Sequence, residues 1–170
     1  MSERLVIFSH GQDGEPWGAK IVAMAEAARA RNYRAESVDY RNIADPAMRV
    51  EKLLAFCKGM TAAPILVGSS LGGHVATAAS QHVGARGLFL LAPAFYMPGY
   101  EQHTPKPARC PMAIVHGWRD DVVPIDNSVR YAREYRATLH AIDADHRMTS
   151  SIDAIVRYLG FFLDGLGETS

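Results

Sequence analysis

The chain has 170 residues, of which 48% are hydrophobic, and its 18 lysines and arginines balance 18 aspartates and glutamates. This length suits one domain over residues 1–170 with a sizeable core, and the interspersed charges argue against a nucleic-acid partner. There is no apolar run long enough to span a membrane, no signal-peptide pattern at the start, and no metal-type spacing of the two cysteines. We therefore expect a cytoplasmic protein with reduced thiols and no membrane partner.

Six short segments are predicted to be strands, because they are apolar or β-branched and end in turn-forming residues. They are residues 5–8, 35–40, the run that starts at Ile65, and residues 88–91, 112–115 and 137–142. Helical spacing of apolar residues predicts helices from Pro16, from Asp45-Pro46, after Ser70, from Asp126 or Asn127, and from Ile152. In the second helix the expected buried stripe is Val50, Leu53, Leu54 and Cys57.

The alternation of strands and helices favours an α/β fold, a three-layer α/β/α sandwich around a mostly parallel six-stranded sheet. Reactive groups in such a sheet gather at the carboxyl ends of the strands. Residues 93–111 interrupt the alternation with several prolines, so we expect a short, irregular, lid-like segment there.

Gly68, Ser70 and Gly72 form a Gly-x-Ser-x-Gly motif between a predicted strand and a predicted helix. This context is typical of a nucleophile elbow, in which a sharp turn lifts the serine above the sheet edge. Gly68, Gly72 and Gly73 are the small neighbours that let the strand and the helix approach closely. For the motif alone, a helix-capping serine in a glycine-rich turn is the alternative.

A serine hydroxyl becomes a good nucleophile only beside a base whose orientation an acid maintains. Asp120 and His146 follow Ser70 in the chain, and each of the three comes after a separate predicted strand. We expect Ser70 to attack an acyl carbonyl, His146 to transfer the proton, and Asp120 to orient the imidazole. The adjacent Asp121 is the less favoured acid.

The oxyanion formed by such an attack needs hydrogen-bond donors. The expected donors are the backbone N–H of Leu71, directly after the serine, and that of Gln12, in the loop after the first strand. His10 suits support of that loop beside Gly11, and His116 suits support of the acid loop by hydrogen bonding.

Four motifs follow one another along almost the whole chain: Ser9-His10-Gly11, Gly68-x-Ser70-x-Gly72-Gly73, His116-Gly117-x-x-Asp120-x-x-Val123-Pro124 and Asp145-His146. In this order they resemble the α/β-hydrolase superfamily, and its small bacterial members with little or no cap domain. The resemblance implies a minimal version of that fold without the family's first two strands. It also implies a serine esterase, thioesterase or related acyl hydrolase that uses no metal and no organic cofactor.

The expected function is therefore hydrolysis of a small carboxylic ester or thioester through an acyl-enzyme on Ser70, with a small acyl molecule as substrate. An amide or peptide hydrolase, and a non-catalytic protein-binding scaffold that keeps the fold, are the alternatives. Five large side chains are candidates to line an acyl pocket, although core packing is their commoner role: Trp17, Phe95, Tyr96, Met97 and Trp118.

Overall fold

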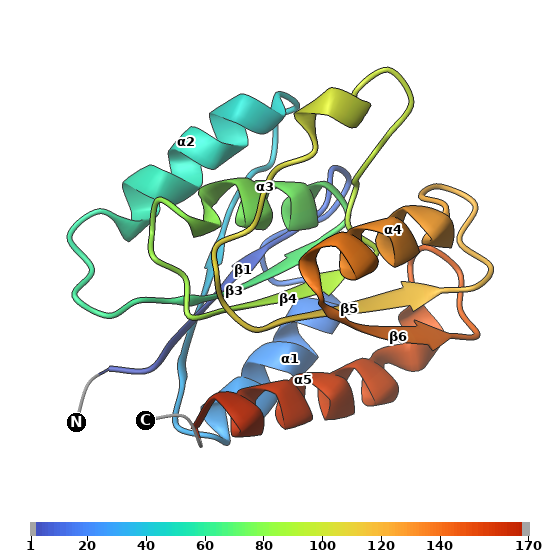
Figure 1. The fold of residues 1–170 in the computed structure, drawn as a ribbon. Helices are drawn as coiled ribbons and strands as arrows, with labels where there is room; N and C mark the ends of the chain where they lie inside the picture. The colour runs from blue at the N-terminus through green and yellow to red at the C-terminus, as the bar shows by residue number, and fades with distance from the viewer. Residues whose placement is uncertain (1–2, 168–170) are drawn as a thin grey trace.

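The computed structural model describes residues 3–167. Within them, six strands form one sheet in the order β2-β1-β3-β4-β5-β6, and each neighbouring pair is parallel (Figure 1). The strands are β1 (Leu5–Ser9), β2 (Arg34–Val38), β3 (Ile65–Ser69), β4 (Gly87–Leu91), β5 (Met112–Gly117) and β6 (Thr138–Ile142). The predicted six-stranded sheet is confirmed, and it is parallel throughout.

Helices cover both faces of the sheet, which confirms the three-layer architecture. Helices α1 and α5 lie side by side on one face, and α2, α3 and α4 cover the other (Figure 1). Their bounds are α1 (Ala19–Arg29), α2 (Pro46–Cys57), α3 (Leu71–Ser80), α4 (Ile125–Tyr135) and α5 (Ile152–Gly167), with 3₁₀ turns at η1 (Glu101–His103) and η2 (Thr149–Ser151).

The central strands are continuous apolar runs because both of their faces are covered. In β1, Val6 and Phe8 pack toward α1 and α5, whereas Leu5 and Ile7 pack toward the opposite helices. The edge strand β6 is half-buried along most of its length. Since the strands are parallel, their carboxyl ends share one edge, and the loops that follow them meet there.

Helix α2 begins as predicted, because the Asp45 carboxylate accepts the N–H of Ala47 at 2.8 Å and Pro46 is the first helical residue. The predicted buried stripe is only partly right. Leu53 is fully buried, but the other three members are half-buried, and Arg49 is buried in their place.

Two other helix starts differ from the prediction. Helix α1 begins three residues after Pro16, whose carbonyl accepts the hydroxyl of Ser37 instead. Helix α4 begins after Pro124, and neither Asp126 nor Asn127 caps it. The Asn127 side-chain amide donates to the carbonyl of Phe95, in the segment before β5. This tertiary contact uses the side chain that the sequence pattern predicted as a helix cap.

Residues 93–111 form the predicted irregular segment between β4 and β5, with the single 3₁₀ turn η1. The segment is attached to its neighbours near both ends. The N–H of Ala94 donates to the carbonyl of Ser70 at 3.0 Å, and the Tyr131 hydroxyl donates to the carbonyl of Pro105 at 2.7 Å. Movement of this segment as a lid stays a prediction.

No helix among residues 3–167 has the length and the apolar composition that a bilayer crossing requires. The two cysteines, Cys57 and Cys110, are free thiols. Burial raises the pKa of both thiols, that of Cys110 to about 11, so neither is a reactive thiolate at neutral pH.

Candidate active site

Ser70 occupies the turn between β3 and α3 in a strained backbone conformation. Its φ of 54° and ψ of −117° lie in a region that side-chain-bearing residues rarely adopt. The turn is held on both sides, because the N–H of Ser70 donates to the carbonyl of Leu91 and its own carbonyl accepts from Ala94. Strain maintained by surrounding hydrogen bonds is the feature expected of a nucleophile elbow.

The glycines of the elbow permit contacts that no other residue would allow. A Cβ atom on Gly68 would collide with the backbone of Gly72, and one on Gly72 would collide with the carbonyl of Ser9. Strand β3, helix α3 and the end of β1 are thereby packed backbone to backbone. The same packing places Gly11 beside the serine, since a Cβ atom on Gly11 would lie 3.6 Å from Cβ of Ser70.

The structure brings Ser70, Asp120 and His146 together at the carboxyl edge of the sheet. Nε2 of His146 lies 3.1 Å from Oγ of Ser70, and Nδ1 lies 2.7 Å from Oδ2 of Asp120. Because the carboxylate can only accept, Nδ1 carries the proton and Nε2 is left to accept the serine hydroxyl. The Asp120 side chain has no exposed surface, whereas that of His146 is 18% exposed.

The Asp120 carboxylate has donors on both oxygens. Oδ1 accepts the N–H groups of Val122 and Val123 at 2.9 and 2.8 Å, and Oδ2 accepts from His146 and lies 3.0 Å from Nε2 of His116. Burial alone would raise the pKa of Asp120, but the hydrogen bonds from His146 and the two valine amides outweigh it and lower the pKa below its ordinary value. Asp120 is therefore an ionised acceptor at neutral pH.

His116 is fully buried and supports the loop that carries Asp120. Its Nε2 lies 2.9 Å from the carbonyl of Val123, which can only accept, so Nε2 bears the proton and Nδ1 accepts the Ser128 hydroxyl at 2.7 Å. Burial lowers the pKa of His116, so the ring is a neutral donor beside the carboxylate. This geometry agrees with the supporting role that the sequence indicated.

The loop that carries His146 is pinned to the end of β5. A Cβ atom on Gly117 would collide with the carbonyl of Ala144, and the N–H of Arg119 donates to that carbonyl at 3.0 Å. On the other side, Nζ of Lys20 donates to the carbonyl of Arg147 at 2.8 Å. The imidazole thus projects from a loop with backbone anchors on both sides.

The backbone N–H groups of the two expected oxyanion donors, Gln12 and Leu71, have no acceptor within the protein, as far as residues 3–167 show. Leu71 is the first residue of α3, where an N–H has no partner within its own helix. Gln12 follows Gly11, where an added Cβ atom would lie 3.6 Å from Cβ of Ser70. Both N–H groups are therefore free to donate to a ligand, and their role as oxyanion donors stays a prediction.

The five residues predicted to line a pocket lie in different environments. Phe95 is fully buried and stacks on Tyr131, with ring centroids 4.0 Å apart, so it is a core residue and faces no open pocket. Tyr96 and Met97 are half-buried in the irregular segment. Trp118 and Trp17 are 60% and 41% exposed. A surface cavity of about 450 Å³ adjoins Gln12, but its lining is polar and includes none of these five side chains.

Arg49 is a buried charged residue near the site that was not predicted from the sequence. It precedes Leu53 by four residues and Cys57 by eight, so helical spacing does place it on the buried face of α2. A charged residue at such a position is usually assumed to point into solvent, so the helical spacing of Arg49 is easily overlooked.

No three His, Cys, Asp or Glu side chains within residues 3–167 gather in a metal-binding arrangement.

A family model described as the alpha/beta hydrolase family matches residues 6–166 of the chain. This protein belongs to the alpha/beta hydrolase family. The match includes every residue of the hydrogen-bonded group around Ser70 and all six strands of the sheet except the first residue of β1.

Solved structures of other alpha/beta hydrolases resemble this family member over nearly its whole length. A protein assigned to the alpha/beta hydrolase superfamily from Xanthomonas campestris pv. campestris is 27% identical, with a TM-score of 0.88, and the match covers 96% of this chain and 99% of that one. Alpha/beta hydrolase domain-containing protein 10 from mouse is 22% identical with a TM-score of 0.81, covering 95% and 90% of the two chains, and shows likeness of fold.

One curated protein is similar over a shorter stretch. The mitochondrial palmitoyl-protein thioesterase ABHD10 of Bos taurus is 34% identical over 68 residues. That stretch covers 38% of this alpha/beta hydrolase and 22% of the bovine protein.

Proposed function

We propose that this protein is a serine hydrolase that cleaves a small carboxylic ester or thioester through an acyl-enzyme on Ser70. The observation that carries the proposal is the pair of hydrogen bonds that join the Ser70 hydroxyl, the His146 imidazole and the Asp120 carboxylate. A buried, ionised acid on one imidazole nitrogen and a serine hydroxyl on the other form the arrangement that activates a serine for acyl transfer.

In the first half of the proposed reaction, Oγ of Ser70 bonds to the acyl carbon while Nε2 of His146 takes the hydroxyl proton. The carbonyl oxygen becomes an oxyanion and accepts the N–H groups of Gln12 and Leu71. When the tetrahedral intermediate collapses, the bond from the acyl carbon to the leaving oxygen or sulfur breaks. His146 gives its proton to that atom, and an alcohol or thiol departs.

In the second half, a water molecule attacks the acyl-enzyme and gives a proton to Nε2 of His146. Collapse of the second tetrahedral intermediate breaks the bond between the acyl carbon and Oγ of Ser70, and the same proton returns to the serine oxygen. The carboxylic acid leaves and the resting enzyme is restored. Similarity to the bovine thioesterase over part of the chain favours testing thioesters beside esters.

The test is Ser70→Ala, assayed with p-nitrophenyl acetate, an acyl thioester and a matched amide. We expect kcat to fall by roughly 10⁴-fold to 10⁶-fold, since a serine triad acts as one unit. A fluorophosphonate probe should label the wild-type protein and leave the variant unlabelled. Hydrolysis of the amide as fast as the ester would favour an amidase instead, and an unlabelled, inactive wild type would identify a non-catalytic scaffold.

A further inference from the structure

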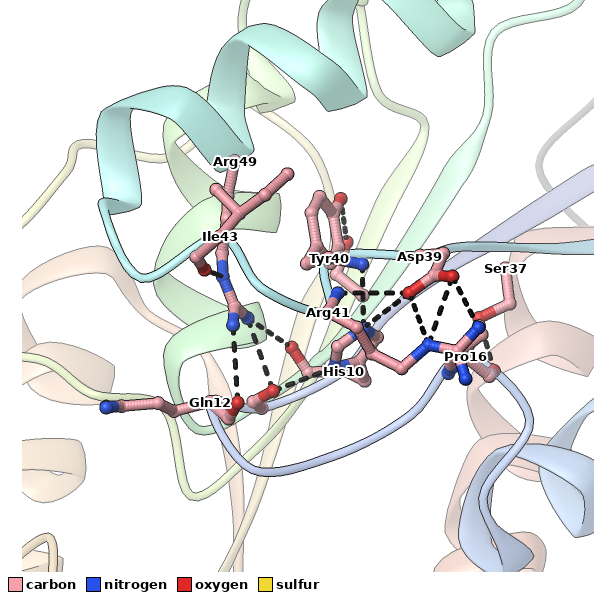
Figure 2. Close-up of polar contacts among 11 residues, drawn as sticks. His10, Gln12, Pro16, Ser37, Asp39, Tyr40, Arg41, Ile43 and Arg49 are labelled. Atoms are coloured by element: carbon pink, nitrogen blue, oxygen red, sulfur yellow. Dashed lines mark hydrogen bonds and ion pairs between the residues drawn. The ribbon is translucent and has the colours of Figure 1, made fainter.

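Arg49 is a buried cation whose hydrogen-bond acceptors are all backbone carbonyls, and its guanidinium carbon also lies 5.3 Å from the centre of the Tyr40 ring. Its side chain is 1% exposed, and within residues 3–167 it forms no ion pair. Figure 2 shows the guanidinium reaching from α2 toward the loop after β1. Nη1 donates to the carbonyls of His10 and Gly11, both at 3.2 Å, Nη2 reaches that of Gln12 at 3.4 Å, and Nε donates to that of Ile43 at 2.7 Å.

Burying an arginine without a carboxylate partner costs desolvation free energy, and an apolar side chain at this position of the helix face would avoid that cost. Burial lowers the pKa of Arg49, yet a guanidinium stays protonated at neutral pH. What the guanidinium supplies, and an apolar side chain cannot, is a planar fork of donors that reaches several carbonyls at once. Three of its four carbonyl partners belong to consecutive residues of one loop, so the loop is what the arginine organises.

His10 holds the same loop from the other side. The backbone N–H of Tyr40 donates to Nε2 of His10 at 2.8 Å, so this nitrogen is unprotonated and Nδ1 carries the hydrogen. Nδ1 therefore donates to the carbonyl of Gly11 at 2.8 Å. Burial lowers the pKa of His10, which keeps the ring neutral and this tautomer in place. The Gly11 carbonyl thus accepts from the His10 imidazole and the Arg49 guanidinium, and also from the N–H of Gly14 at 3.3 Å.

The direction of that carbonyl determines the direction of the next amide. The peptide bond between Gly11 and Gln12 is planar and trans, as are all peptide bonds in the described residues, so the Gly11 oxygen and the Gln12 hydrogen point opposite ways. With the oxygen turned toward Arg49, the N–H turns away from it. Because an added Cβ atom on Gly11 would lie only 3.6 Å from Cβ of Ser70, we expect rotation of this one peptide to change whether its N–H or its carbonyl oxygen faces the serine.

We propose that Arg49 is a positioning residue that fixes the Gly11–Gln12 peptide so that the Gln12 N–H is ready for the oxyanion formed at Ser70. The inference rests on the proposed function. Arg49 touches no reacting atom, and it acts through the orientation of one peptide. Without it, the Gly11 carbonyl keeps the His10 imidazole at 2.8 Å and the N–H of Gly14 at 3.3 Å, and the peptide gains freedom to rotate.

The test compares Arg49→Gln and Arg49→Lys with Arg31→Gln. Arg31 also makes several hydrogen bonds, to Asp164 and to the carbonyl of Ala27. It lies between the end of α1 and the start of β2, at the amino ends of the strands and away from Ser70, so it serves as the matched control. The measurements are kcat and KM for p-nitrophenyl acetate, thermal unfolding, and affinity for phenylboronic acid. A boronic acid adds to the serine oxygen as a tetrahedral anion and therefore probes the oxyanion donors.

For Arg49→Gln we expect kcat to fall about 10-fold to 100-fold with little change in KM, somewhat less than the loss of an entire oxyanion donor. Boronate affinity should fall by a similar factor. Arg49→Lys keeps the charge but not the planar set of donors, so its kcat and boronate affinity should lie between those of the wild type and those of Arg49→Gln. Arg31→Gln should keep wild-type kcat and boronate affinity even if its melting temperature drops.

Wild-type kcat and boronate affinity in a folded Arg49→Gln protein would overturn the inference. So would equal losses in Arg49→Gln and Arg31→Gln, which would reflect stability alone, or loss of the folded state in both Arg49 variants, which would assign the residue to folding. An active Ser70→Ala protein would instead remove the proposed function. The two failures are therefore distinguishable.

Discussion

At the scale of single residues, the two oxygens of Asp120 have separate tasks. Oδ1 receives two backbone N–H groups and Oδ2 faces two imidazoles. An asparagine here would keep its carbonyl oxygen on the backbone donors and turn its NH₂ toward His146. The imidazole would then carry its proton on Nε2, the nitrogen that must accept from Ser70.

Asp120→Asn should therefore lower kcat by about 10⁴-fold while the protein stays folded, because the wrong tautomer blocks proton transfer. The measurement is the rate of ester hydrolysis, with thermal unfolding as the check on structure. Asp121→Asn is the control, since its side chain is exposed and adjacent in the chain. A large loss in Asp121→Asn with a normal Asp120→Asn would exchange the roles of the two carboxylates.

Residue positions near the site differed in how well the sequence predicted them. Ser70, Asp120 and His146 were expected to meet because each follows a strand, and parallel strands end at one edge. Arg49 was missed although its spacing from Leu53 places it on the buried face of α2, because a charged side chain at such a position is usually assigned to solvent. From the sequence, Phe95 could line a pocket or pack in the core. Its full burial and its stacking on Tyr131 assign it to the core.

At the scale of elements, the site depends on how closely β1, β3 and α3 approach one another. The helix start is set by backbone contact between Gly72 and Ser9, which leaves no room for a side chain. From the glycines, the sequence predicted a close approach of β3 and α3, but not the contact of Gly72 with Ser9 of β1. It did not predict the starts of α1 and α4, because Pro16 and Asn127 are engaged by residues far away in the chain.

Gly72→Ala should destabilise the protein by about 1–3 kcal/mol or more, since the added methyl group meets backbone that cannot move aside freely. Gly165→Ala is the matched substitution, because a Cβ atom at that position in α5 meets nothing within 4 Å. It should stabilise the protein by roughly 0.5–1 kcal/mol through helix propensity. Urea denaturation measures both, and equal effects of the two changes would contradict the packing argument.

At the scale of the whole molecule, folding takes several histidines out of water. Burial lowers the pKa of His10, His74, His116 and His140 below the ordinary value of 6.5. The unfolded chain therefore binds more protons than the folded one just below pH 6.5. Their contribution to stability is present above that pH and is lost as the pH falls through it toward the lower folded values.

We expect the urea midpoint to be lower at about pH 5.5 than at about pH 7.5, as protonation of these rings favours unfolding. His82→Gln is the control, because His82 lies on the exposed surface and its replacement should leave the difference between the two midpoints unchanged. A midpoint that is constant or rises on acidification would show that the buried rings are protonated in the folded protein.

The two ends of the described chain also meet. A Cβ atom on Gly167 would lie 3.3 Å from the guanidinium of Arg4, at the side of the molecule away from the strand tips (Figure 1). The first and last described residues therefore lie on the same side of the molecule, and the contact of Ser70, Asp120 and His146 does not depend on their order along the chain. A circular permutant that links this side and opens at the exposed Gly99 would carry them in the order Asp120, His146, Ser70, and we expect the same three side chains to meet.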